Sequence, residues 1–238
     1  MKEEFTMTQF NAGQKIGDIV TRFPKAADIF KEYRIDFCCG GERILREVLQ
    51  REGHNETEIL GRINDLYAEL KNIRDTEQDW SQEESGPLSD YVVNTHHAYL
   101  NAELPRISEL ITMILRVHGE SHPELKGVHR LFHHLKLELE QHLIKEEAIE
   151  FPLMKEQETK PSANIQKEIR RIIQELKAEH DGAGDILKEL RTITNDFAVP
   201  ADACNSYRIT YQKLAELESD IFQHVHLENN ILFPRYLG

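Results

Sequence analysis

The sequence contains one motif twice, and this repeat restricts both the fold and the chemistry of the chain. A histidine, a glutamate four residues later and a Phe-Pro pair nine residues after the histidine occur at 142–152 and again at 224–234. Residues four apart on an α-helix lie on the same face, one turn above each other. Each copy also has an upstream histidine, His97 or His180, at separations of 45 and 44 residues. The pattern predicts two equivalent pairs of helices.

Turn residues lie halfway between the two histidines of each pair. Gly119 stands in the segment Val-His-Gly-Glu-Ser-His-Pro, and Asp202 closely follows Val199-Pro200. Glycine and proline are typical of turns, and two antiparallel helices joined at such midpoints bring their histidines to the same height. We therefore expect an all-α protein containing an up-down-up-down four-helix bundle, with helices at about 89–117, 123–157, 162–196 and 202–236.

The duplicated residues lie on the apolar faces of these predicted helices. In the last helix, for example, Leu217, Ile221, His224, Glu228 and Ile231 recur at spacings of three or four. One histidine on such a stripe is more often a hydrogen-bonded core residue than a metal ligand. Burying carboxylates beside histidines, however, is costly without a compensating cation. The sequence thus predicts a metal site whose ligands are His97, His142, Glu146, His180, His224 and Glu228.

Imidazole and carboxylate ligands in a bundle core are typical of paired iron ions. The coordination positions of two six-coordinate irons can be counted in a hypothetical scheme. One position on each iron stays open when the ligands are four histidines, two bridging glutamates and a bridging oxide or hydroxide. Dioxygen or nitric oxide would enter there. The same ligand set tolerates manganese or zinc.

Other histidines compete with these ligands. His96 adjoins His97, but the apolar residues that follow His97 match those that follow His180, so we prefer His97. His226 is two residues from His224 and hence on another face of the helix. His118 and His122 fall in the predicted turn, where they would cap a helix or relay protons.

The N-terminal part of the chain indicates a second, smaller helical domain. We assign 1–75 to this domain, 76–87 to a polar linker and 88–238 to the bundle. Cys38 and Cys39 precede two glycines, which suggests an exposed loop where a thiolate would bind metal or exchange disulfides. The alternative is a partly buried structural pair. We expect Cys204 to pack within its helix.

Composition excludes several classes of partner. The 42 acidic residues against 29 basic ones argue against nucleic acid or an anionic membrane. No apolar run approaches the roughly 20 residues that cross a bilayer, and the N-terminus lacks the layout of a signal peptide. Three cysteines, two of them adjacent, do not form a disulfide framework. We expect a cytoplasmic protein.

With both motifs and the cysteine loop in view, the chain closely resembles the repair-of-iron-centres family, the ScdA or YtfE proteins. The resemblance covers nearly the whole chain, and it rests on 23–27, 36–41, 145–147, 179–181, 224–230 and 233–234. It implies a stress protein whose haemerythrin-like bundle holds a non-haem di-iron centre, with the six ligands named above. Its partners would be iron–sulfur proteins damaged by nitric oxide or peroxide.

The resemblance also favours some functions over others. An iron donor or repair protein is favoured over a conventional enzyme, with nitric oxide reduction at the centre as an added activity. The alternative is a module that binds or senses dioxygen or nitric oxide. Oxygen-carrying haemerythrins use five histidines and have an aspartate in one of their two carboxylate positions, whereas both motifs here hold glutamate. Ferroxidase-type storage is disfavoured, and a homodimer is left open.

Overall fold

The structure is a computed structural model that describes residues 10–70 and 79–237. These residues form helices and no strand, which confirms the all-α prediction. They divide into two compact units. The first unit contains the described residues up to Glu83 together with His226–Pro234, and the second contains Glu84–Val225 and the C-terminal residues. None of the described helices is long and apolar enough to cross a membrane.

The N-terminal part of the first unit packs short helices around an apolar core. Phe23, Phe30 and Leu45 are at most 1% exposed, and they come from different segments of this part. The residue after the α3 helix is Gly53. Its φ of 76° is a left-handed conformation that favours glycine and ends the helix. The described helices here are α1 (Ile16–Arg22), α2 (Ala26–Glu32), α3 (Leu45–Glu52) and α4 (Glu56–Leu70).

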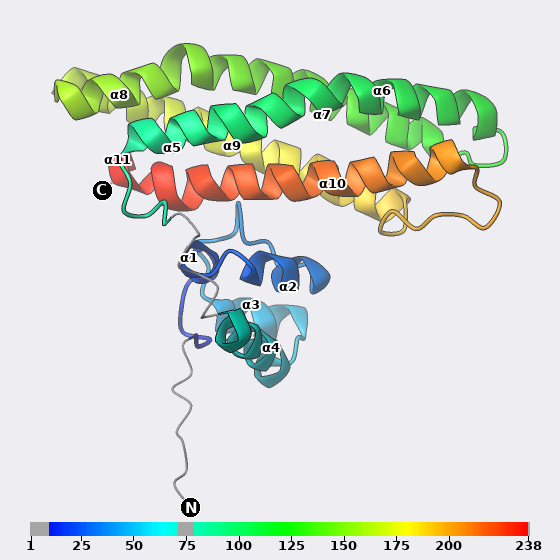
Figure 1. Ribbon diagram of the computed structural model, residues 1–238, viewed down its shortest axis with the longest axis horizontal. Helices are drawn as coiled ribbons and strands as arrows, with labels where there is room; N and C mark the ends of the chain where they lie inside the picture. Colours follow the sequence, from blue (N-terminus) through cyan, green and yellow to red (C-terminus); the bar gives the residue numbers. More distant parts are fainter. Residues whose placement is uncertain (1–9, 71–78, 238) are drawn as a thin grey trace, which may run out of the picture. The chain divides into compact units, whose positions relative to one another are not determined.

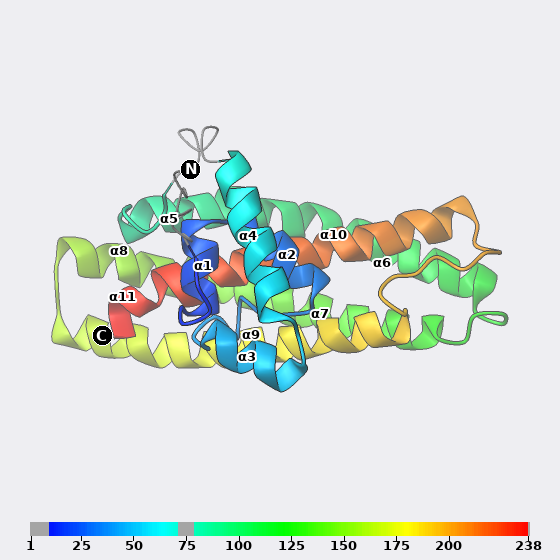
Figure 2. The same cartoon turned by 90° about the horizontal axis from the view of Figure 1, so that it is seen from below.

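Four long helical runs within 85–237 form the predicted bundle (Figures 1 and 2). The α7 helix packs against both α6 and α9, and side chains such as Ile107, Leu135 and Leu176 fill the interior without measurable exposure. The runs are α5 (Ser85–Val92), η2 (Val93–His97) and α6 (Ala98–His118); α7 (Leu125–Lys145), η3 (Glu146–Glu150) and α8 (Phe151–Thr159); α9 (Ala163–Ile193); and α10 (Asn205–Leu227), η4 (Glu228–Leu232) and α11 (Pro234–Leu237).

The ends of the helices lie within a few residues of the predicted ends. Helix α5 begins at Ser85, inside the segment predicted as a linker, while 76–78 of that segment lie outside the described residues. The larger difference from the predicted helices is a local change in their hydrogen bonding. Each run that contains η2, η3 or η4 changes for one turn from α-helical to π-helical hydrogen bonding. A π turn inserts one extra residue into the helical repeat and shifts the face that follows.

Candidate metal centre

The structure brings the six predicted ligands together in two overlapping groups. One group consists of His97, Glu146, His224 and Glu228, and each residue offers an atom within 4.8 Å of the others. The second group replaces the two histidines by His142 and His180 and keeps both glutamates. Each group therefore has two imidazoles of its own, and both groups share two carboxylates. This donor arrangement is compatible with metal binding.

The Glu146 carboxylate lies between the two groups. Its Oε1 atom is 3.0 Å from Nε2 of His142, and its Oε2 atom is 3.2 Å from Nε2 of His97. Oε2 is also 3.8 Å from Nε2 of His224. One oxygen of this carboxylate thus faces the histidines of each group.

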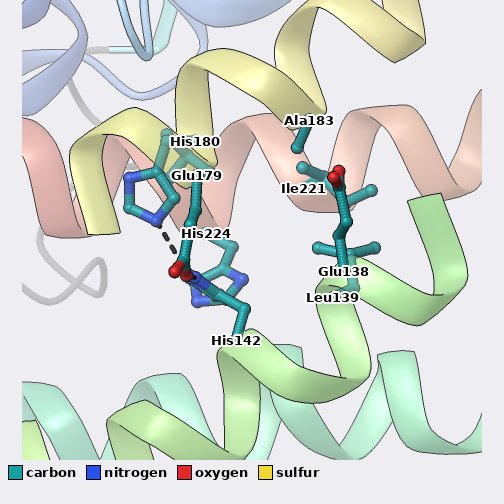
Figure 3. A pocket seen from close by; sticks show the side chains of 9 residues that line it. Glu138, Leu139, His142, Glu179, His180, Ala183, Ile221 and His224 are labelled. Atoms are coloured by element: carbon teal, nitrogen blue, oxygen red, sulfur yellow. Dashed lines mark hydrogen bonds and ion pairs between the residues drawn. The ribbon is translucent and has the colours of Figure 1, made fainter. Parts of the chain in front are cut away.

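His142 and His180 approach each other from neighbouring helices (Figure 3). Their Nε2 atoms are 3.1 Å apart. Two nitrogens held at 2.0–2.1 Å from one ion, at an angle near 90°, are separated by about 3 Å. The observed spacing therefore suits two ligands of a single ion.

Burial supports the fit of a cation. All six residues are at most 4% exposed, and Glu146 and Glu228 have no exposed surface. Two ionised carboxylates in one dry interior repel each other and lose their hydration, which costs several kcal/mol per ion when it is not compensated. Positive charge between the imidazoles and carboxylates would offset this cost.

A second layer of carboxylates orients the imidazoles. Nδ1 of His97 lies 2.8 Å from Oε1 of Glu147, and Nδ1 of His142 lies 2.8 Å from Oε2 of Glu179. When Nδ1–H donates to a carboxylate, Nε2 keeps its lone pair for a metal. The contact with His142 and the ion pair with Lys145 lower the pKa of Glu179 to about 2, so this acceptor stays ionised at neutral pH.

The π-helical turns coincide with the ligands. Turn η2 ends at His97, η3 begins at Glu146 and η4 begins at Glu228. Such turns occur frequently at functional sites because they redirect a side chain without ending the helix. Here the irregularity is confined to the level of the bundle where the two groups lie.

Two neighbouring histidines lie outside both groups. The ring of His96 stacks on that of His224 at 5.6 Å, and its Nδ1 is 2.9 Å from Oδ1 of Asp220. His226 is buried, its Nδ1 lies 3.2 Å from the amide nitrogen of Asn230, and burial lowers its pKa to about 4. Both rings have other polar partners than the shared glutamates.

A small pocket reaches the histidines from one side. It has a volume of about 10 Å³ and is lined by His142, His180 and His224, which is roughly the space of one water molecule. Figure 3 shows Leu139, Ala183 and Ile221 grouped with Glu138, apart from the imidazoles, and Glu179 and Val225 complete the lining.

The cysteine pair forms a separate group with Asp36. Oδ1 of Asp36 accepts the backbone N–H groups of Cys39 and Gly40 at 3.1 and 3.0 Å and lies 3.4 Å from Sγ of Cys38. The two sulfur atoms are 3.9 Å apart, and both thiols are free.

The expectation of an exposed pair is wrong for Cys38, which is 4% exposed, whereas Cys39 is half-buried. The hydrogen bond with Cys39 and burial raise the pKa of Cys38 well above its usual range. At neutral pH this residue is a thiol, and a metal must displace its proton to bind.

Sequence reasoning did not assign Glu147, Glu179 or Asp220 to the site. Glu147 and Glu179 directly adjoin the ligands Glu146 and His180 in the sequence. That adjacency was a usable signal, but which ring each carboxylate reaches depends on how neighbouring helices pack. Asp220 lies one helical turn before His224, and no motif marks it.

Comparison with known proteins agrees with this arrangement. Residues 89–236 match the family described as "Hemerythrin HHE cation binding domain", and 12–67 match ScdA_N, described as "Domain of Unknown function (DUF542)". A "Probable iron-sulfur cluster repair protein" of Haemophilus influenzae is 34% identical, over 95% of this chain and 98% of that protein.

Two further relatives align with this chain over nearly their whole length. The "Iron-sulfur cluster repair protein YtfE" of an Enterobacter species is 30% identical, over 94% of this chain and 97% of its own. The "Iron-sulfur cluster repair protein ScdA" of Staphylococcus epidermidis is also 30% identical, over 92% and 96%. With both family matches in place over an all-helical fold, this chain belongs to the YtfE and ScdA family of iron–sulfur cluster repair proteins.

Proposed function

We propose that this protein restores damaged iron–sulfur clusters and that its bundle holds two iron ions. The observation that carries the proposal is the pair of buried ligand groups that share Glu146 and Glu228. The names of relatives that align over nearly their whole length support the same activity. We further propose that 1–75 form the N-terminal domain, 76–87 the linker and 88–238 the bundle. We also propose that the protein is cytoplasmic and acts as an iron donor or repair protein and not as a conventional enzyme.

Each ion would have its own pair of histidines. His97 and His224 would hold one iron, His142 and His180 the other, and the two glutamates would bridge them with an oxide or hydroxide. When bound, iron supplies one-electron redox chemistry and open positions for small ligands. The chain keeps Nε2 of His97 and His142 available, because Glu147 and Glu179 lie against the Nδ1 atoms.

Iron donation follows from the difference between these ligands and those of a cluster. Imidazole and carboxylate hold ferrous iron less firmly than the thiolates and sulfide of a cluster site, for which soft ligands are preferred. Transfer of Fe²⁺ from the bundle to a depleted cluster site is therefore favourable. The protons of the receiving thiols are released as the metal binds.

The cysteine pair is a candidate for an intermediate iron acceptor in the first unit. Asp36, Cys38 and Cys39 offer one oxygen and two sulfur atoms within 4.8 Å of one another. This donor set combines the carboxylate of the bundle with the thiolates of a cluster. Two thiols with one carboxylate suit a transfer site, because iron would exchange more readily there than at four thiolates.

Entry of nitric oxide or dioxygen is supported by the pocket beside His142, His180 and His224. A gas that entered this pocket would lie beside three of the histidines that we propose as iron ligands. We therefore propose these gases as ligands and an iron–sulfur protein as the recipient.

A reconstitution assay tests the proposal. Iron-loaded full-length protein is mixed with a cluster-depleted dehydratase, sulfide and a thiol reductant, and recovery of dehydratase activity is followed. We expect faster recovery than with the same amount of free ferrous iron or with iron-free protein. The matched variant is Glu228→Leu, which should behave like iron-free protein. Recovery no faster than with free iron would reject cluster repair and favour a gas-binding role.

A further inference from the structure

A further cluster of side chains whose types can ligate a metal lies at the end of the bundle that carries the α6–α7 and α9–α10 connections. Figure 1 shows both connections at the end opposite α11. The first connection is bounded by His118 and Leu125, and the second ends where α10 begins at Asn205. All the residues discussed below belong to the second unit. The cluster shares no residue with the two ligand groups of the candidate metal centre.

Two pairs of donor atoms span the connections. Nε2 of His118 lies 3.1 Å from Sγ of Cys204, and Nε2 of His122 lies 3.2 Å from Oδ2 of Asp202. A nitrogen and a sulfur or oxygen atom bound to one tetrahedral ion are about 3.3–3.6 Å apart. Both pairs are thus close to the spacing that a shared ion would impose. The prediction that Cys204 packs within a helix is wrong, because this residue is exposed and precedes α10.

His122 has a carboxylate at each ring nitrogen. Nδ1 of His122 lies 3.2 Å from Oε1 of Glu124, which also accepts the hydroxyl of Tyr207 at 3.3 Å, and Nε2 faces Asp202. When Nδ1–H donates to Glu124, the contact between Nε2 and the Asp202 carboxylate needs either a second proton or a cation between them. The carboxylate–histidine–metal sequence is the usual environment of a ligating histidine.

The cluster is accessible from one side and closed on the other. Tyr207 has no exposed surface, and its ring lies 5.6 Å from the ring of His118 and 5.4 Å from that of His122. The side chain of Asp202 is 68% exposed. An ion would reach the site from solvent and rest against an aromatic wall.

We propose that His118, His122, Asp202 and Cys204 bind one divalent ion of the zinc class. One thiolate, two imidazoles and one carboxylate form a mixed tetrahedral donor set that such ions prefer over magnesium or calcium. No three of these four donor atoms lie within 4.8 Å of one another. Binding therefore includes side-chain rotations that bring the His118–Cys204 pair and the His122–Asp202 pair together. The ion joins the two connections.

Titration with cobalt(II), a spectroscopic probe for zinc sites, tests this proposal. The parent protein is iron-loaded, full-length and carries Cys38→Ser and Cys39→Ser, so that Cys204 is its one thiol. We expect one cobalt ion that gives a sulfur-to-cobalt absorption band in the near ultraviolet together with the strong visible bands of four-coordination. Addition of zinc should abolish both signals. Cobalt bound in the bundle interior lacks a thiolate ligand and gives no such ultraviolet band.

Variants separate a built site from a lone reactive thiol. Cys204→Ser should remove the ultraviolet band, and His118→Ala, His122→Ala and Asp202→Asn should each weaken cobalt binding by at least about tenfold. Glu124→Gln should weaken it by about 10- to 100-fold, the usual effect of a residue that orients a ligand. His134→Ala is the matched control, since His134 is an exposed residue of α7 paired with Glu138, and it should bind cobalt as the parent does. Absence of the band in the parent, or unchanged affinity in the His118, His122 and Asp202 variants, would overturn the proposal.

Discussion

Nε2 of His142 and Nε2 of His180 lie 3.1 Å apart although the two residues belong to different helices, α7 and α9. Two imidazole nitrogens at this distance need either a shared proton or a shared cation between them. The shared glutamates next to this pair favour the cation, because both are fully buried.

Loss of either shared carboxylate should abolish iron binding without unfolding the bundle. In Glu146→Leu and Glu228→Leu an apolar side chain replaces a buried carboxylate on an apolar face, which removes the bridge and its desolvation cost together. Iron analysis and circular dichroism measure the two effects. Glu175→Leu, at an exposed position of α9, is the control and should keep its iron. Two irons retained in both buried-site variants would assign the bridge to other acids.

The two neighbouring histidines should be dispensable for iron. His96→Ala should lower the free energy of unfolding by about 1–3 kcal/mol, because Asp220 loses a partly buried hydrogen-bond partner. His226→Ala leaves a small cavity in its place. Both variants should contain as much iron as the unaltered protein, as measured by elemental analysis. A clear loss in either variant would mean that the wrong helix face was assigned to the ligands.

Much of the fold was predictable because apolar residues repeat at helical spacing over long stretches, as in Leu217, Ile221 and Ile231 of the last run. The duplicated spacing likewise placed His142 and His224 at one level. The π turns η3 and η4 directly precede the repeated pairs Phe151-Pro152 and Phe233-Pro234, a marker that the sequence analysis did not use, whereas η2 has no nearby proline or glycine.

Contacts between distant segments could not be predicted from the sequence either. The approach of Cys204 to His118 depends on where two connections meet in space. The burial of Cys38 likewise depends on the packing of its own unit, whereas its Gly-Gly neighbours suggested exposure.

Filling the pocket should slow the entry of a gas without removing iron. Ala183 lines the pocket one turn after His180, and Ala183→Leu places an isobutyl group there at a cost of about 1–3 kcal/mol in stability. We expect a lower rate of nitric oxide binding in stopped-flow absorbance, at unchanged iron content. The adjacent Gly182→Ala is the control, because a Cβ atom at Gly182 meets nothing within 4 Å. Equal rates in both variants would show that gas enters elsewhere.

The cysteine pair should be needed for repair and not for the centre itself. A Cys38→Ser, Cys39→Ser variant keeps all six ligands of the bundle, so we expect unchanged iron content. It should lose its advantage over free iron in the dehydratase assay, because serine does not supply the thiolate that soft metal binding requires. Full repair activity would reduce the pair to a structural role.

The raised pKa of Cys38 predicts how the repair rate of the protein depends on pH. If iron passes through the pair, its binding releases the thiol proton, and the repair rate of the unaltered protein should rise with pH across the neutral range. The double-serine variant has no such proton to release and should show a flatter profile.

The central claim is tested most directly by the number of irons in anaerobically purified full-length protein and by whether their spins are coupled. Elemental analysis combined with Mössbauer spectroscopy of the oxidised protein counts the ions and reports whether their spins are coupled. The account predicts two irons per chain in one antiferromagnetically coupled pair. One tightly bound iron per chain, or two uncoupled irons, would contradict a centre bridged by Glu146 and Glu228.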